Sequence, residues 1–180
     1  LREPNSVGVP IIRGLSWSPF WRHAADAMKG PIQLFPVRLG EVARMWRNEF
    51  DQRVKPLGLS QARGFALLLL SQRAEGMTQN ELADRVGIRG STLVRQLDLL
   101  ERQGLVVRQE TPHDRRVKTV QLTPKAEPLV HAVERIAQQL RSEMLSGITE
   151  AELRSSLSVL ERSKDRLLAD GCRRRKSEAN

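Results

Sequence analysis

Two groups of polar side chains in the middle of the chain have the types and spacing needed to bind nucleic acid. The first comprises Ser91, Thr92, Arg95 and Gln96. Small hydroxyls let a backbone approach closely, while arginine can make two hydrogen bonds with guanine and glutamine two with adenine. If these side chains share the exposed face of a helix, they predict base contacts in the major groove of B-DNA, which is about 12 Å wide.

The second group is the turn Pro112-His113-Asp114-Arg115-Arg116, which lies between two alternating segments. Two guanidinium groups at a hairpin tip suit a narrow A·T-rich minor groove, because its negative potential attracts arginine. Asp114 carries the wrong charge to contact phosphate, so we predict that it orients Arg116 through an ion pair. The alternative is a solvated turn whose ion pair contributes almost nothing to stability.

Two short helices are predicted to position the first group. Thr78 and Glu81 have the spacing of a capping box at the start of one helix, and Gly87 permits the tight turn that follows it. We expect Ser91 or Thr92 to cap the second helix. Periodicity alone fits an ordinary amphipathic helix with a solvated polar face. The capped helix and the glycine turn before it favour a helix that reads DNA.

A hairpin is predicted to carry the arginine-rich turn. Gly104 occupies the position of a residue that ends a helix, and residues 105–110 and 117–122 have the pattern of two strands. Residues 60–122 therefore predict a winged helix-turn-helix. The expected fold class is mainly α with a small β-hairpin wing (α+β).

The segment before this unit divides into an extension and a helix. One apolar stripe from Leu39 to Val54 predicts the first helix, and Ser60 is suited to cap a second over residues 61–72. Residues 1–38 are rich in proline and are expected to be a partly irregular extension, in which residues 19–28 could form a short helix. One hypothesis is that translation starts at Met28; the other is a genuine extension that packs on the assembled protein.

Two further helices are predicted after the hairpin. Thr123-Pro124 places proline at the first position of a long helix, which Gly147 ends, and Thr149 starts the next. The apolar stripe of the long helix consists of Leu129, Val133, Ile136, Leu140 and Met144. We therefore expect a folded domain over 39–170, in which helices within 39–57 and 124–170 flank the winged unit, and a basic tail over 171–180.

Composition narrows the class of function. The 180 residues include 30 Lys and Arg against 21 Asp and Glu, and this net charge of +9 favours a polyanionic partner. Cys172 is the only cysteine, so no internal disulfide can form, which fits the cytoplasm. No apolar run approaches the roughly 18 residues of a membrane span. No metal-ligand spacing, phosphate loop or nucleophile–base pair emerges, so neither an enzyme nor a cofactor is expected. The alternative is a basic protein that binds membrane surfaces, or nucleic acid without sequence preference.

These motifs, taken in order, resemble the MarR family of bacterial transcriptional regulators, and most closely its SlyA-like branch. The resemblance covers about residues 39–168. It is carried by Ala43-Arg44-Met45-Trp46-Arg47, Lys55-Pro56-Leu57, Ser91, Leu93-Val94-Arg95, Leu97, Leu100-Glu101, Gly104-Leu105-Val106, Arg108, Asp114-Arg115-Arg116 and Leu122-Thr123-Pro124.

The resemblance implies a homodimer whose first, fifth and sixth helices interleave with those of the partner, which would bury the apolar stripes. Two recognition helices would then meet half-sites of a pseudo-palindrome about 34–36 Å apart on double-stranded DNA. The complete set of residues predicted to make up the DNA-binding site is Arg89, Ser91, Thr92, Arg95, Gln96, Asp114, Arg115 and Arg116.

The resemblance also implies release from DNA by a small aromatic acid. Arg44 and Arg47 match first-helix positions that face the ligand crevice, and arginine can pair with a carboxylate; the alternative is that both are surface charges. Gly64 and Leu68 stand where the branch usually has an aromatic residue and a histidine, and Phe65 is the candidate to compensate. Cysteine-based sensing in the family uses a residue near the first helix, so Cys172 does not support that mechanism.

Overall fold

The computed structural model describes the backbone of residues 30–111 and 114–177, and the side chains of this part except residues 110–117 and 171–177. The chain divides into two compact units, Leu1–Glu49 and Phe50–Asn180. Within the described residues, no helix is both long and apolar enough to cross a membrane.

Helix α2 (Pro31–Val54) begins eight residues before the expected start at Leu39, and its last five residues belong to the second unit. Pro31 is tolerated at the first position because the first N–H groups of a helix have no partner within it. Pro36 lies inside the helix and removes one backbone bond. The expected start of this helix was therefore too late, and residues 31–38 of the partly irregular extension are helical. The suggested helix around 19–28 lies outside the described residues.

In the second unit, α2 is followed by a 3₁₀ turn, η1 (Lys55–Leu57), and by α3 (Gln61–Ser71). The Ser60 hydroxyl accepts the Arg63 N–H over 3.5 Å, so Ser60 caps α3 as predicted. At the turn between η1 and α3, Gly58 has a φ of 72°, a conformation that side-chain-bearing residues rarely adopt.

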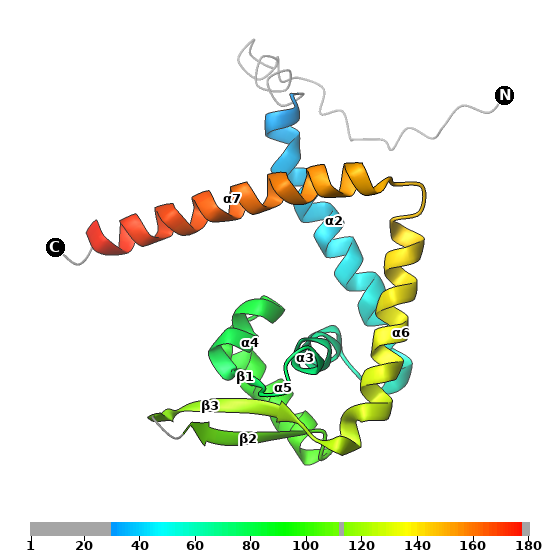
Figure 1. The fold of residues 1–180 in the computed structure, drawn as a ribbon, viewed down its shortest axis with the longest axis vertical. Helices are drawn as coiled ribbons and strands as arrows, with labels where there is room; N and C mark the ends of the chain where they lie inside the picture. The colour runs from blue at the N-terminus through cyan, green and yellow to red at the C-terminus, as the bar shows by residue number, and fades with distance from the viewer. Residues whose placement is uncertain (1–29, 112–113, 178–180) are drawn as a thin grey trace, which may run out of the picture. The chain divides into compact units, whose positions relative to one another are not determined.

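The helix-turn-helix consists of α4 (Gln79–Val86) and α5 (Gly90–Arg102), as Figure 1 shows. Thr78 caps α4 by accepting the Glu81 N–H over 3.2 Å. The reciprocal half of the capping box is not formed; the Glu81 carboxylate pairs with Arg73 and Arg85 instead. Only the first half of the predicted box is therefore confirmed.

Three antiparallel strands form the wing in the order β1-β3-β2: β1 (Met77–Thr78), β2 (Val106–Thr111) and β3 (Asp114–Leu122). The hairpin was predicted, although β3 begins three residues earlier than expected. β1 was not predicted. It can pair with β3 because Gly76 has no side chain: a Cβ there would lie 2.3 Å from the Val120 carbonyl oxygen.

The core of the second unit forms around α3, which packs against α4, α5 and α6 (Glu127–Met144). Its largest buried side chains come from every layer: Phe50, Val54, Leu67, Met77, Leu82, Leu93, Leu97, Leu100, Val106, Val120, Val133 and Leu140. These apolar contacts fix the helix-turn-helix and the wing on one scaffold.

The long helix after the wing differs from its prediction in two details. Its first turn, Pro124–Ala126, is a 3₁₀ helix (η2), and α6 follows it. The buried face is Val130, Val133, Ala137 and Leu140. Met144 is exposed in the single chain, so its burial by a partner stays a prediction. Contact with α3, and not periodicity alone, selects the buried face within the chain.

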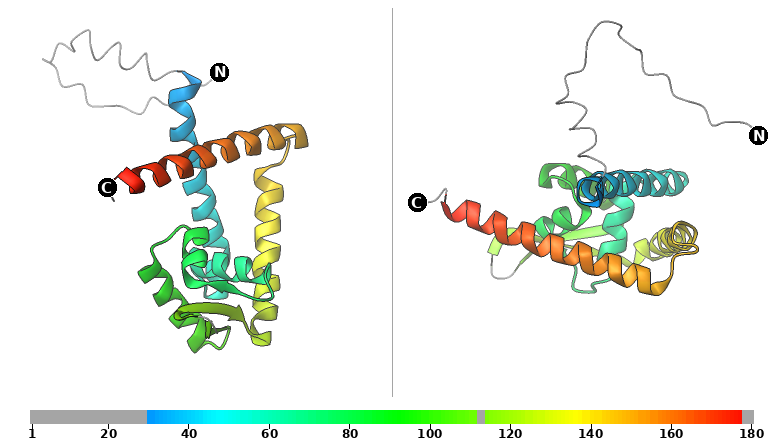
Figure 2. Two further views of the ribbon diagram at one scale, coloured as in Figure 1. Left: turned by 60° about the vertical axis from the view of Figure 1, so that its left-hand side comes forward. Right: turned by 90° about the horizontal axis from the view of Figure 1, so that it is seen from above.

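Helix α7 (Glu150–Ser177) follows α6 after a short turn at Gly147, as Figure 2 shows. A complete capping box starts it at Thr149, the predicted start: the Thr149 N–H donates to Glu152 over 2.8 Å, and the Glu152 N–H donates to the Thr149 hydroxyl over 3.3 Å. The backbone remains helical through residues 171–177, so the expected basic tail continues α7 and does not begin as a separate segment.

Candidate nucleic-acid interface

Helix α5 begins with two exposed hydroxyl residues, Ser91 and Thr92, in its first turn. Arg89 is the N-cap, in an extended conformation, and its carbonyl accepts the Thr92 and Leu93 N–H groups over 2.9 and 3.0 Å. The prediction that Ser91 or Thr92 caps the helix was wrong. Gly87 ends α4 so abruptly that only residues 87–89 separate the two helices, and both hydroxyl residues fall inside α5.

The two faces of α5 are as different as the sequence pattern predicted. Leu93, Leu97 and Leu100 are fully buried. The opposite face presents exposed side chains at the helix start: Arg89, Ser91, Thr92 and Arg95. The positive end of the helix dipole lies at the same place and favours an anion such as phosphate. The apolar back therefore holds a polar and basic front toward solvent.

Gln96 occupies a different environment from the other predicted base contacts. It is half-buried, and its Oε1 accepts a hydrogen bond from the Ser60 hydroxyl over 3.2 Å. A two-bond contact with adenine uses both the oxygen and the nitrogen of the amide. Gln96 would have to break its hydrogen bond with Ser60 to make that contact, whereas the exposed Arg95 side chain has no such bond to break.

The wing reaches outward as a two-stranded ribbon beyond its pairing with β1. The last backbone pair at its tip is Thr111 with Asp114, next to a register irregularity between Glu110 and Thr111. The side chains of Asp114, Arg115 and Arg116 lie outside the described residues, and so do Pro112 and His113. The predicted Asp114–Arg116 pair and the minor-groove contact therefore stay predictions.

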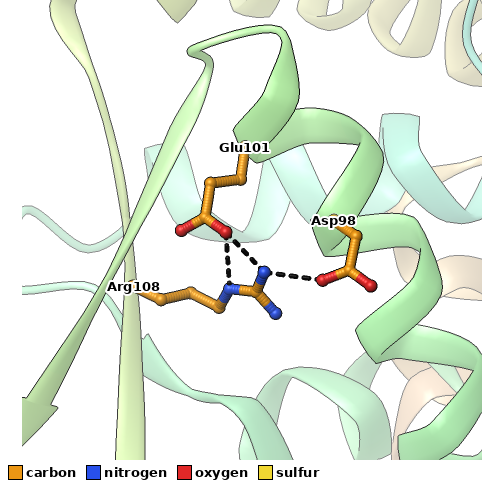
Figure 3. Close-up of polar contacts among 3 residues, drawn as sticks. All are labelled: Asp98, Glu101 and Arg108. Carbon is orange, nitrogen blue, oxygen red and sulfur yellow. Dashed lines mark hydrogen bonds and ion pairs between the residues drawn. The ribbon is translucent and has the colours of Figure 1, made fainter.

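An ion-pair cluster joins the wing to the recognition helix, and Figure 3 shows its three side chains. Arg108 on β2 donates from Nη2 to Asp98 Oδ1 over 2.6 Å and from Nε to Glu101 Oε2 over 3.1 Å. Its Nη2 also contacts Glu101 Oε2. Only 17% of the Arg108 side chain is exposed. These bonds raise the pKa of Arg108 and lower that of the Glu101 carboxyl, in each case chiefly through the hydrogen bond between them.

Sequence reasoning used Arg108 only as part of a family resemblance and assigned it no role. The sequence nevertheless contains a pattern that indicates an ion pair between Arg108 and the preceding helix. Asp98 and Glu101 are three residues apart, so they lie on one flank of a helix, and Arg108 follows in the middle of the next strand. Two carboxylates so close together repel each other unless a cation pairs with them.

The residues predicted to bind an effector fall in both units. Arg44 and Arg47 are exposed on the part of α2 that belongs to the first unit. In the second unit, Gly64 is buried, while Phe65 and Leu68 are half-buried on α3. The ligand roles of these five residues stay predictions.

Gly64 and Phe65 also have a packing role. A Cβ on Gly64 would lie 3.0 Å from the Phe50 ring, so glycine lets this ring rest on the α3 backbone. Phe65 meets the same ring with a centroid separation of 4.6 Å. Among the side chains that the structure describes, no group of three or more His, Cys, Asp or Glu is arranged to hold a metal ion.

Comparison with known proteins places this geometry in a family. Residues 57–117 match the sequence profile described as MarR family. The transcriptional regulator PA3341 is 45% identical, with 75% of this chain and 98% of that chain covered and a TM-score of 0.70. CouR from Rhodococcus jostii RHA1, whose structure holds p-coumaroyl-CoA, is 26% identical, with 74% and 93% covered and a TM-score of 0.63.

SlyA, which represents the branch suggested by the sequence, shares the fold at 23% identity, with 76% of this chain and 95% of that chain covered and a TM-score of 0.66. The profile match falls on the helix-turn-helix and the wing, and the PA3341 match extends over nearly the whole length of that regulator. The chain belongs to the MarR family of transcriptional regulators, with a winged-helix DNA-binding fold, and is not an enzyme.

Proposed function

We propose that the protein binds a pseudo-palindromic operator as a homodimer and reads it with the N-terminal half of α5. The observation that carries this proposal is the exposed front of Arg89, Ser91, Thr92 and Arg95 on a helix whose back is fully buried. A helix with such a front fits the major groove, where Arg95 can donate two hydrogen bonds to one guanine. The short hydroxyl side chains let the backbone come close, and Arg89 at the helix start suits phosphate.

The wing supplies the second contact of the proposed interface. Its backbone carries Asp114, Arg115 and Arg116 to the tip of an antiparallel ribbon. An arginine there can enter a narrow minor groove next to the major-groove site. In this arrangement Asp114 orients Arg116, and Arg115 adds charge near the phosphates.

A homodimer is supported by apolar side chains that the chain itself leaves exposed. On α2 these are Ile32, Leu34, Phe35, Val37, Leu39, Val42 and Met45, and on α7 they are Leu157, Val159, Leu167 and Leu168. Large exposed apolar patches mark interfaces. A second copy of the chain would bury these faces and set two recognition helices about one turn of DNA, roughly 34 Å, apart.

We further propose that a small aromatic carboxylate, or a related acyl compound, controls DNA binding. The exposed Arg44 and Arg47 are the anchors for its negative charge, and Gly64, Phe65 and Leu68 are the candidates for its ring. CouR, at 26% identity, holds p-coumaroyl-CoA, whose acyl group derives from an aromatic acid. That likeness supports the class of ligand and leaves its identity to experiment.

The competing proposal is a basic protein that binds membranes, or nucleic acid, without sequence preference. It is favoured only by the net charge of +9. Selection of bound fragments from genomic DNA, followed by footprinting, separates the two. A protected pseudo-palindrome, together with a dimer by light scattering, supports the proposed function. Equal binding to unrelated duplexes, or retained binding to anionic vesicles by a peptide of residues 171–180 alone, supports the competitor.

Salicylate provides a simple probe of effector control. We expect it to weaken operator binding by the parent protein and to have less effect on Arg44→Ala and Arg47→Ala, because each loses a partner for the carboxylate. Arg135→Ala, which removes an exposed arginine from α6, is the matched control. Equal responses of all four proteins would rule out Arg44 and Arg47 as anchors.

A further inference from the structure

We propose that Arg108 is a positioning residue for DNA recognition: it holds the wing at a fixed angle to α5, so that the major-groove and wing contacts fall at one spacing. This inference rests on the proposed function, since the two contacts matter only if the protein reads DNA. It assigns a role to a side chain that itself stays away from DNA.

The geometry of the cluster is suited to fixing an angle. One planar guanidinium bonds two carboxylates, Asp98 and Glu101, which lie one turn apart on α5. Two bonds in different directions from one rigid plane restrain both the distance and the rotation of β2 against the helix. A lysine at this position would keep the charge but could not reproduce the fork.

Charge and burial exclude Arg108 as a phosphate ligand in this arrangement. Its side chain is 17% exposed, and two of its nitrogens already donate to α5. With one cation and two carboxylates, the cluster carries a net charge of −1 and would repel phosphate. Arg108 thus offsets part of the repulsion that Asp98 and Glu101 bring to the recognition helix.

The position of Arg108 along the wing gives small rotations a large effect. Arg108 pairs with Val120, where β3 also pairs with β1, and outward from Thr119 the wing is only two-stranded. Such a ribbon is marginally stable alone. Thr111 lies three residues farther out, roughly 10 Å at about 3.3 Å per residue, so a rotation of about 10° at Arg108 would move it by roughly 2 Å.

The test measures preference for the selected operator over a scrambled duplex of equal length, at fixed salt and well below the melting temperature of each variant. We expect Arg108→Met to lower this ratio by about tenfold, within the range for one good base contact. Arg108→Lys keeps the positive charge, so its affinity for the scrambled duplex should match that of the parent. Its preference for the operator should stay as low as that of Arg108→Met. Arg102→Met, which removes an exposed arginine from the last turn of α5, should change neither.

A charge exchange separates positioning from direct contact. In the double variant Glu101→Arg with Arg108→Glu, the pair between β2 and α5 can form again, so we expect the ratio to recover relative to Arg108→Glu alone. No recovery would indicate that Arg108 touches DNA and would overturn the inference. An unchanged ratio in Arg108→Met, or an equal loss on both duplexes, would also overturn it.

Hydrogen exchange provides a readout that needs no DNA. In Arg108→Met we expect faster exchange of β2 and β3 amides outward from residue 109, with α5 amides unchanged, because the clamp acts on the ribbon. Equal exchange in the two proteins would overturn the clamp. If the parent shows no operator preference, the proposed function fails, and the exchange experiment still decides whether Arg108 fixes the wing.

Discussion

The Ser60 hydroxyl donates a hydrogen bond to Gln96 Oε1 over 3.2 Å and thereby joins the N-cap of α3 to the recognition helix. Beside it, the Gln61 N–H donates to Asp51 Oδ1 of α2 over 2.6 Å. The end of α2, the start of α3 and the middle of α5 are thus connected through neighbouring polar contacts. Gln96 holds α5 on its scaffold, in contrast to the adjacent Arg95, which is exposed.

Exchanging Gln96 for alanine should affect stability more than base preference. We expect Gln96→Ala to cost about 1 kcal/mol of unfolding free energy, the usual contribution of a partly buried hydrogen bond. Ser60→Ala should cost about 1–2 kcal/mol, because it also loses the N-cap. The double variant should be less destabilised than the sum, since both changes remove one shared bond. Additive losses in urea unfolding would show that the bond contributes nothing.

Arg95→Ala should weaken discrimination at a single base pair of each half-site. The expected loss is about 1–3 kcal/mol for that base pair, while affinity for scrambled DNA changes little. Arg102→Ala serves as the control, because Arg102 is exposed on the same helix but at its far end. Competition with a set of operators mutated one base pair at a time measures the effect. A uniform loss across all of them would place Arg95 on phosphate instead of a base.

Gly76→Ala should be strongly destabilising because two penalties act together. The residue has a φ of 78°, and its new Cβ would lie 2.3 Å from the Val120 carbonyl oxygen. Gly58→Ala is the matched control: its φ is 72°, but nothing lies within 4 Å of the added atom. We expect about 1–2 kcal/mol for Gly58→Ala, the cost of the left-handed conformation, and more for Gly76→Ala. Similar melting temperatures would mean that β1 shifts at little cost.

Acid should weaken the clamp between the wing and α5. The hydrogen bond from Arg108 holds the pKa of Glu101 below its ordinary value. A carboxyl with a depressed pKa in the folded state stabilises the protein above the unfolded value, about 4.3, and loses this effect as pH falls through the folded value. Unfolding free energy should therefore fall with acid less steeply in Glu101→Gln than in the parent. The effect is modest because 40% of the Glu101 side chain is exposed.

The same pH window includes other carboxyls, so only the difference between the two proteins is informative. Arg53 lowers the pKa of Glu143, and Thr149 lowers that of Glu152. Both carboxyls remain in Glu101→Gln and contribute equally to the two titrations. Parallel curves from pH 7 through the whole acid range of the unfolding titration would show that the Glu101 pair has no net effect on stability.

The parts of the fold that depend on local chemistry could be predicted from the sequence. Thr78, Gly87 and Gly104 act within a few residues of their own position, so caps and turns set the limits of α4 and the end of α5. The alternating apolar pattern likewise indicated the hairpin. Leu93, Leu97 and Leu100 identified the buried face of α5, and through it the exposed front.

The remaining features depend on contacts between distant parts of the chain. β1 has two residues and exists only because β3, some forty positions later, pairs with it. Ser60 and Gln96 are 36 positions apart in the sequence, and no local pattern predicts the hydrogen bond between them. The capping of α5 was predicted wrongly because Ser and Thr suit a cap but can also lie inside the first turn, and the length of the preceding turn decides between the two positions.

Sequence-specific binding by the winged helix is tested most directly by titrating the selected operator and a scrambled duplex between 50 and 200 mM salt, using fluorescence anisotropy. With roughly 6–10 phosphate contacts, affinity should fall by about 10³–10⁵ over this range, and the preference for the operator should persist while both affinities decline. A flat salt dependence, or equal affinity for the two duplexes, would contradict the proposed mode of DNA recognition.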